Sequence, residues 1–378
     1  MGTRRVARRR GCDTTMRVRL AAAALTLATL ASIVFPVDGI RFEPAARANL
    51  FADARVDDSP LARTHRPLIG VLSQPPYWEG APAAPRGYIA ASYVKWLETA
   101  GARAVPIWYD EPNATLDAKL AAVNGVLLPG GDSDVSRGTP LRATAERIVR
   151  AALDARDAGD YFPVWGTCMG FQLLALAVAD DPLDAPLEPY DGANVTSHLR
   201  VVERADRGRA LGSLHEDVYA AATGYVDGVP SGGMTTETVY ENHEFGVAPR
   251  AFEDFAQLAE TFGPPVATDE DRRGKTFAAL VEGREGLPLY GAQFHPEKPA
   301  AEWDPALAIP HSAEAVAVGQ GLANFFVAEA RKSGRSPKPD AQPGFAEDDL
   351  VMANHATTFV GKGGYVGTHF DEIYVFGE

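Results

Sequence analysis

Short apolar runs alternate with stretches of helical periodicity from residue 68 onward. The runs Leu68–Leu72 and Gly125–Leu128 are apolar throughout, as expected of strands buried on both faces of a sheet. Residues 88–100 repeat their apolar side chains at helical spacing, and a long helix is predicted at residues 141–158. This alternation predicts an α/β fold with a doubly wound, mostly parallel sheet and helices on both faces.

The pattern is less regular toward the C-terminus. Residues 180–274 contain Pro and Gly throughout and predict short strands and loops, before a strand at Thr276–Glu282 and an amphipathic helix at residues 313–332. We therefore expect one catalytic domain at residues 66–333. The remaining extension, residues 334–378, has β-rich patches and is expected to pack on the domain as a hairpin or edge strand.

The N-terminus has the pattern of a secretory signal. Seven arginines precede an apolar run at residues 20–35, and a basic segment followed by a short apolar one is typical of signal peptides. The run is shorter than the about 20 apolar residues that span a bilayer, and an uncleaved anchor is the alternative. We expect a signal peptide at residues 1–36 and a linker or pro-segment at residues 37–65. The protein would enter the secretory pathway and reach a lysosome, a vacuole or the outside of the cell.

The charge argues against two classes of partner. The formal net charge of the 378 residues is −14, and the signal segment is basic, so the rest of the chain is more acidic still. Such a body repels phosphate backbones and anionic lipid surfaces. We expect no nucleic-acid partner and no stable membrane insertion after signal removal, whereas a homodimer remains open. Two sequons, at Asn113 and Asn194, are compatible with glycosylation on an export route.

A single cysteine remains once the signal is removed. Cys12 lies in the predicted signal peptide, which leaves Cys168 without a disulfide partner. Cys168 stands in the frame Gly166-Thr-Cys-Met-Gly170 between a predicted strand and a predicted helix, the cysteine version of a nucleophile elbow. A helix N-terminus favours a thiolate, and the Met169 amide would face a developing oxyanion. The alternative is a buried cysteine that packs as a small apolar residue.

Two further segments supply the other groups that thiol chemistry needs. His295 follows a predicted strand, and imidazole titrates near neutrality, so we predict that it is the base. Glu297, two residues later, would orient the ring. Gly130 and Gly131 follow another predicted strand and would let backbone N–H groups approach a substrate as part of an oxyanion hole. The alternatives are a surface turn for the first segment and a simple β-turn for the second.

With these segments in place, the chain resembles the gamma-glutamyl hydrolase family of the class I glutamine amidotransferase-like superfamily, whose domain is flavodoxin-like. The resemblance runs from about residue 66 to residue 332, and is strongest at residues 88–103, 160–171 and 293–298. It implies Cys168 as nucleophile, His295 as base, Glu297 as the third member of the triad, and Gly130, Gly131 and Met169 around the oxyanion.

The resemblance also implies residues that bind the substrate. It places His243 beside the active site, although a loop histidine is an equally good interpretation. The resemblance implies a substrate with several carboxylates, so an enzyme of net negative charge needs cationic side chains near its site to bind it. Arg86, Lys95 and Lys298 are the candidates, and a solvated helix-face charge is the alternative for Lys95.

The implied reaction is hydrolysis of folyl poly-γ-glutamates through a thioester, with release of glutamate or γ-glutamyl peptides. We expect no metal and no cofactor, because the eight histidines do not cluster with one another or with the cysteines. Two alternatives stay open: a hydrolase of another γ-glutamyl amide, and a non-catalytic glutamate-binding module. A glutaminase that feeds ammonia to a synthase is disfavoured, since no second catalytic domain is evident.

Overall fold

The structure is a computed structural model. It describes residues 63–76, 86–181, 183–202, 207–226, 229–230, 236–338, 344, 346–360 and 369–377. All of these belong to one compact unit, Asp57–Glu378. The predicted signal peptide, residues 1–36, and nearly all of the predicted linker, residues 37–65, lie outside the described residues, so both remain predictions.

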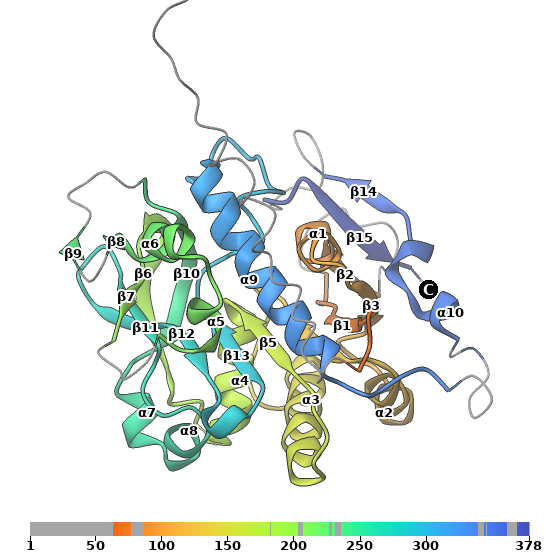
Figure 1. The fold of residues 1–378 in the computed structure, drawn as a ribbon. Coiled ribbons are helices and arrows are strands. Elements are labelled where there is room, and N and C mark those ends of the chain that lie inside the picture. Colours follow the sequence, from red (N-terminus) through yellow and green to blue (C-terminus); the bar gives the residue numbers. More distant parts are fainter. Residues whose placement is uncertain are drawn as a thin grey trace, which may run out of the picture. The chain divides into compact units, whose positions relative to one another are not determined.

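An eight-stranded sheet organises this unit (Figure 1). Its strands are β1 (Leu68–Leu72), β3 (Arg103–Ile107), β4 (Gly125–Leu128), β5 (Val164–Thr167), β7 (Arg200–Val201), β11 (Ala267–Glu270), β12 (Thr276–Glu282) and β13 (Leu289–Ala292). Their order across the sheet is β3-β1-β4-β5-β13-β12-β11-β7. The strands from β3 to β13 pair in parallel, and β12, β11 and β7 continue in antiparallel pairing. The predicted mostly parallel sheet is confirmed.

Helices cover both faces of the sheet, as predicted (Figure 1). One apolar core contains residues of α1 (Ala91–Thr99), α5 (Arg209–Gly212), α6 (Glu216–Thr223) and α9 (Ala313–Arg331). The other contains residues of α2 (Asn113–Ala122), α3 (Pro140–Asp157), α4 (Met169–Ala179), α7 (Ala251–Asp254) and α8 (Ala256–Thr261). Along β4, Leu127 belongs to the first core and its neighbours Val126 and Leu128 to the second, as the alternation of a strand requires. Within the described residues, every helix is too short or too polar to cross a membrane.

Three smaller sheets and three short helical segments complete the described elements. The sheets pair β6 (Leu187–Ser197) with β10 (Val239–Val247), β8 (Tyr225–Val226) with β9 (Val229–Pro230), and β15 (Glu372–Phe376) with both β14 (Thr357–Phe359) and β2 (Gly87–Ala90). The short segments are the 3-10 helices η2 (Arg284–Gly286) and η3 (Met352–Asn354), and α10 (Glu347–Leu350).

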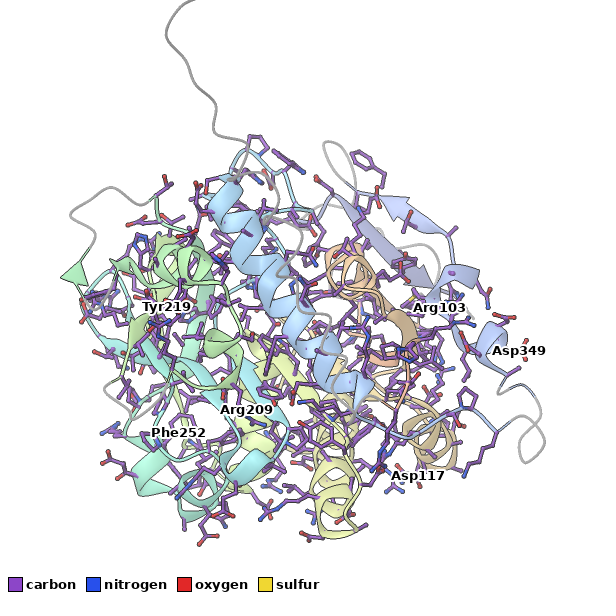
Figure 2. All side chains as sticks on the ribbon, in the orientation of Figure 1. Arg103, Asp117, Arg209, Tyr219, Phe252 and Asp349 are labelled. Atoms are coloured by element: carbon purple, nitrogen blue, oxygen red, sulfur yellow. The ribbon has the colours of Figure 1, made fainter. Side chains whose placement is uncertain are left out.

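Part of the C-terminal extension pairs with a strand of the preceding residues. β15 pairs with β14 in antiparallel fashion, and it also pairs with β2, which makes it the middle strand of its sheet. The predicted helical start at residues 88–90 is therefore wrong, because these residues pair with β15 as a strand. Arg103, labelled in Figure 2, donates a hydrogen bond of 3.2 Å to Glu347 and so ties the edge strand β3 to α10.

Candidate active site

Cys168 lies at a sharp turn between β5 and α4. Its backbone has φ 51° and ψ −113°, a strained positive-φ conformation that costs a non-glycine residue about 1–3 kcal/mol. The turn is tight enough to need both flanking glycines. A Cβ on Gly166 would lie 2.5 Å from the Gly170 carbonyl oxygen, and a Cβ on Gly170 would lie 1.8 Å from that of Leu128. The predicted nucleophile elbow is therefore present, and this strained turn places the thiol at the carboxyl end of the parallel strands.

His295 and Glu297 form a buried pair at the end of the neighbouring strand. The Cys168 amide donates to the Ala292 carbonyl at 2.7 Å, which joins the elbow to β13, the strand that leads to His295. Nδ1 of His295 lies 2.8 Å from Oε1 of Glu297. The two residues are only 5% and 2% exposed. The structure thus brings the three predicted triad residues together.

The charges of this group set its protonation. Burial lowers the pKa of His295, but the Glu297 charge, and after it the Cys168 thiol, raise it to about 9. Burial likewise opposes the Glu297 charge, yet His295 lowers the pKa of that carboxyl below its ordinary value. His295 is therefore charged at neutral pH. Its Nε2 is buried and makes no aligned hydrogen bond with a described residue, so its proton is available beside the thiol.

In the glycine loop after β4, the backbone amides of the two glycines differ in their hydrogen bonding. Gly130 donates its N–H to the Tyr93 hydroxyl at 2.8 Å, so this amide cannot serve a substrate oxygen at the same time. The amides of Gly131 and Met169 make no hydrogen bond with any described residue. The predicted oxyanion hole therefore narrows to Gly131 and Met169. Gly130 serves by having no side chain, since a Cβ there would lie 2.9 Å from Cε1 of His295.

Sequence reasoning missed two residues that hold this loop. Gln74, buried after β1, donates from Nε2 to the Gly130 carbonyl at 2.7 Å and accepts from the Ser133 hydroxyl at 3.0 Å. Tyr93 lies on the apolar face of α1, where the sequence pattern predicts only an ordinary core residue. Burial, followed by the charges of Glu297 and Cys168, raises the pKa of Tyr93 well above its ordinary value, so it stays neutral.

Strand β10 covers the nucleophile from the other side. The Asn242 carbonyl oxygen lies 3.8 Å from Sγ of Cys168, and Gln172 of α4 donates to the Phe245 carbonyl at 2.7 Å. The predicted substrate residue His243 lies on the same strand, with its side chain 1% exposed. The structure places His243 near the thiol but buries its ring.

Of the three candidate cations, Lys298 lies beside the triad. It is buried, its charge helps to lower the pKa of Glu297, and its Nζ lies 4.8 Å from the ring centroid of Phe370. The other two are engaged elsewhere. Arg86, the predicted substrate residue, precedes β2, and its Nε lies 3.3 Å from Oδ1 of Asp110. Lys95 forms a half-exposed pair with Glu372, with 3.1 Å between Nζ and Oε2. The structure therefore does not bring Arg86 or Lys95 to the triad.

The two sequon asparagines differ in their surroundings. Asn113 is exposed at the start of α2. Asn194 has φ 57°, and its side-chain amide is held on both sides. Oδ1 accepts from the Ala308 amide at 2.6 Å and from the Tyr240 hydroxyl at 3.2 Å, and Nδ2 donates to the Ala306 carbonyl at 3.3 Å. A glycan on Asn194 would have to disrupt these contacts.

Metal ligands do not gather at the site. Within the described ranges, no group of three or more His, Cys, Asp or Glu side chains is arranged to hold a metal ion. The groups that the structure places around Cys168 are one imidazolium, one carboxylate and two amides without a partner among the described residues. This set can activate a thiol, hold a developing oxyanion and protonate a leaving group.

Comparison with known proteins identifies relatives that match most of the chain. Residues 88–309 match the family described as glutamine amidotransferase class-I. The chain is 36% identical over 317 residues to a gamma-glutamyl hydrolase of Glycine max, which covers 82% of this chain and 85% of that protein. It is 33% identical over 317 residues to gamma-glutamyl hydrolase 1 of Arabidopsis thaliana, with coverage of 82% and 83%. A gamma-glutamyl hydrolase of Rattus norvegicus is 35% identical over 271 residues, with coverage of 71% and 78%.

Proposed function

The chain belongs to the gamma-glutamyl hydrolase family of class I glutamine amidotransferase-like enzymes, and we propose that it cleaves γ-glutamyl amide bonds with Cys168 as the nucleophile. The observation that carries the proposal is the strained Cys168 elbow beside the buried His295–Glu297 pair. A cysteine that served only as core would need neither the positive φ nor a charged imidazole next to it.

The proposed mechanism uses each group in the place where it lies. The Cys168 thiolate attacks the γ-carbonyl carbon. The carbonyl oxygen becomes negative and accepts hydrogen bonds from the amides of Gly131 and Met169. His295 then gives its Nε2 proton to the leaving nitrogen, the carbon–nitrogen bond breaks, and a thioester remains. Water attacks the thioester and gives one proton to His295, the carbon–sulfur bond breaks to release the thiolate, and the γ-carboxylic acid that forms loses its remaining proton to solvent. Glu297 keeps the ring oriented throughout.

We propose that the substrate carries an aromatic group, as a folyl poly-γ-glutamate does, because an exposed tryptophan lies where it could bind such a group. Trp303 is 61% exposed, and its ring stacks on His311 with centroids 3.9 Å apart and planes 3° apart. Asn194 ties the loop between them to the site, because its Oδ1 accepts from a loop amide and from the Tyr240 hydroxyl. The ring of Tyr240 lies 6.1 Å from that of His295. An aryl group at the end of a γ-glutamyl chain could stack on the open face of Trp303.

The decisive experiment compares defined chains by mass analysis of the products. We expect the enzyme to cleave pteroyl-γ-glutamyl chains, to leave the matched α-linked chains almost intact, and to act more weakly on γ-glutamyl chains without the aryl group. Equal kcat/KM with and without the aryl group would favour the alternative of a hydrolase for other γ-glutamyl amides. The product masses also distinguish removal of single glutamates from internal cleavage.

The Cys168→Ala variant tests the chemistry itself. We expect it to lose turnover while it keeps its fold, and we expect iodoacetamide to inactivate the wild type by labelling Cys168. Appreciable hydrolysis by the variant would contradict the nucleophile. A wild-type protein that binds glutamyl chains but turns over none of them would favour the non-catalytic glutamate-binding module.

We also propose that the protein is exported, on the sequence pattern of residues 1–36. A lysosome, a vacuole or the extracellular space would be its destination. Asn113 is the better placed glycan acceptor, since Asn194 is engaged by its side chain. A homodimer is compatible with this proposal, and the molecular mass in solution would decide it.

A further inference from the structure

The buried ring of His243 fixes the position of one of its protons. Nδ1 lies 2.9 Å from the Phe245 carbonyl oxygen, which can only accept, so Nδ1 carries a hydrogen. In a neutral ring Nε2 would then be a bare acceptor. Yet Nε2 lies 3.2 Å from Oε2 of Glu241, which is also an acceptor when that carboxyl is ionised. Two acceptors at this distance repel, so either Nε2 of His243 or the Glu241 carboxyl must carry a proton.

This contact is what compensates the burial of Glu241. The residue is 1% exposed, and neither of its carboxylate oxygens makes an aligned hydrogen bond with a described residue. The contact with His243 is an ion pair by distance, although its direction is not that of a hydrogen bond. An uncompensated buried carboxylate would cost several kcal/mol.

A second buried acid, Asp269 of β11, lies within the electrostatic reach of Glu241. Burial, followed by the Glu241 charge, raises the pKa of Asp269 to about 7. Three groups act in the opposite direction: the Ser197 hydroxyl and the Glu270 amide, which donate to Asp269, and the Arg200 charge. Arg200 is itself paired with Glu270. The neighbourhood of Glu241 therefore changes its charge close to neutral pH.

The strand that carries Glu241 and His243 lies directly over the nucleophile. Asn242, the residue between them, has its carbonyl oxygen 3.8 Å from Sγ of Cys168. The pairing of β10 with β6 shifts its register on both sides of His243, so the ladder alone does not fix this segment. Side-chain contacts must fix it instead.

We propose that Glu241 is a positioning residue for the reaction at Cys168. The close pair of Glu241 and His243 fixes the bulged segment whose Asn242 carbonyl contacts the thiol. Ionisation of Asp269 adds a second negative charge beside Glu241 and weakens the arrangement. The inference rests on the proposed cysteine chemistry. It also makes His243 a positioning residue, since the ring is too deeply buried to contact a substrate.

The first test compares two glutamates of the same strand. Glu241→Gln removes the charge and keeps the shape, and Glu244→Gln, at an exposed position, is the matched control. We expect E241Q to lower kcat about tenfold with KM changed by less than about twofold, and E244Q to leave both unchanged. Glu241→Asp, which keeps the charge, should retain more kcat than E241Q. If E241Q has the kcat and KM of E244Q, the proposal is overturned.

The second test needs no substrate. The rate at which iodoacetamide alkylates Cys168 is measured between about pH 4 and pH 9 for the wild type, E241Q and Asp269→Asn. Every profile contains the ionisation of the thiol itself. The wild type should show a further step near pH 7, where Asp269 ionises, and E241Q should show this further step at lower pH, because the neighbouring charge no longer raises the pKa of Asp269. Asp269→Asn should keep the step of the thiol and lack the further one. A wild-type profile identical to that of Asp269→Asn would overturn the proposal, whereas a wild type without γ-glutamyl hydrolysis would overturn only the proposed function.

Discussion

The Tyr93 hydroxyl accepts a hydrogen bond from the Gly130 amide at 2.8 Å, and this bond connects helix α1 to the loop predicted to form the oxyanion hole. Tyr93 also lies beside Glu297, whose charge contributes to the raised pKa of the phenol. Tyr93 thus connects the loop with the triad.

Tyr93→Phe should therefore destabilise the protein and slow it. The change leaves a buried N–H without a partner, which costs about 1–3 kcal/mol, and it frees the loop to move relative to Met169. We expect a lower free energy of unfolding in urea and a fall in kcat of about tenfold, with little change in KM. Wild-type values for both quantities would show that the bond is dispensable.

His295 makes the stability of the protein depend on pH in a defined window. Its pKa rises from 6.5 to about 9 on folding, so its charged form contributes stability that is fully present below about pH 6.5 and is lost as the pH passes through about 9. Urea unfolding of the wild type should show this loss, and His295→Asn should lack it. Glu297→Gln should move the loss to lower pH, because Glu297 is the main group that raises the pKa of His295.

The same two variants should differ in activity. His295→Asn removes the proton donor and should abolish nearly all turnover. Glu297→Gln removes only the orienting charge and should reduce kcat by about ten- to a thousandfold. Equal losses in the two variants, measured on one γ-glutamyl substrate, would contradict this division of roles.

Gly170→Ala should be among the most damaging changes outside the triad. Its Cβ would lie 1.8 Å from the Leu128 carbonyl oxygen, a backbone atom that cannot move without displacing β4. Gly212→Ala in α5 is the control, because nothing lies within 4 Å of its added Cβ, and alanine is the better helix former. We expect failure to fold or a loss of several kcal/mol for the first, and unchanged or slightly raised stability for the second. Comparable melting temperatures would refute the close approach.

The mature protein should begin between Val37 and Arg66. A basic segment and a short apolar run precede this interval, and signal peptidases cleave after such runs. N-terminal sequencing of the protein purified from its native source is the measurement. An active enzyme that retains the arginines of residues 4–19 would rule out a cleaved signal.

The sequence predicted the parts of the fold and site whose signals are local. The elbow glycines surround Cys168 in a single frame, and His295 and Glu297 are two residues apart, so short segments predict all three triad residues. The long apolar or periodic segments behind β1, β4 and α3 are local in the same way. The predicted start of the helix at residue 88 was wrong, because residues 88–90 pair as a strand with β15, which is remote in sequence.

The missed residues act through contacts that are distant along the chain. Gln74 holds a loop more than fifty positions away, and nothing in its neighbours indicates this. Tyr93 shares an apolar helix face with Trp96 and Leu97, so hydrophobic periodicity predicts a core position and gives no sign of a role for the hydroxyl. The region from β6 to β10 was ambiguous for another reason. Strand β6 is mostly half-buried and pairs with β10 with shifts in register, so this region lacks a clean alternation.

The register of β13 against β5 has a consequence for how such an enzyme can diverge. Thr167 pairs with Ala292, and the Cys168 amide continues the ladder, so the thiol and the imidazole keep their spacing whatever lies between them in the chain. The loops around β6 and β10 can accept insertions and substitutions while the reacting atoms stay in place. Descendants of one ancestral hydrolase could therefore acquire new substrates by changing these loops alone.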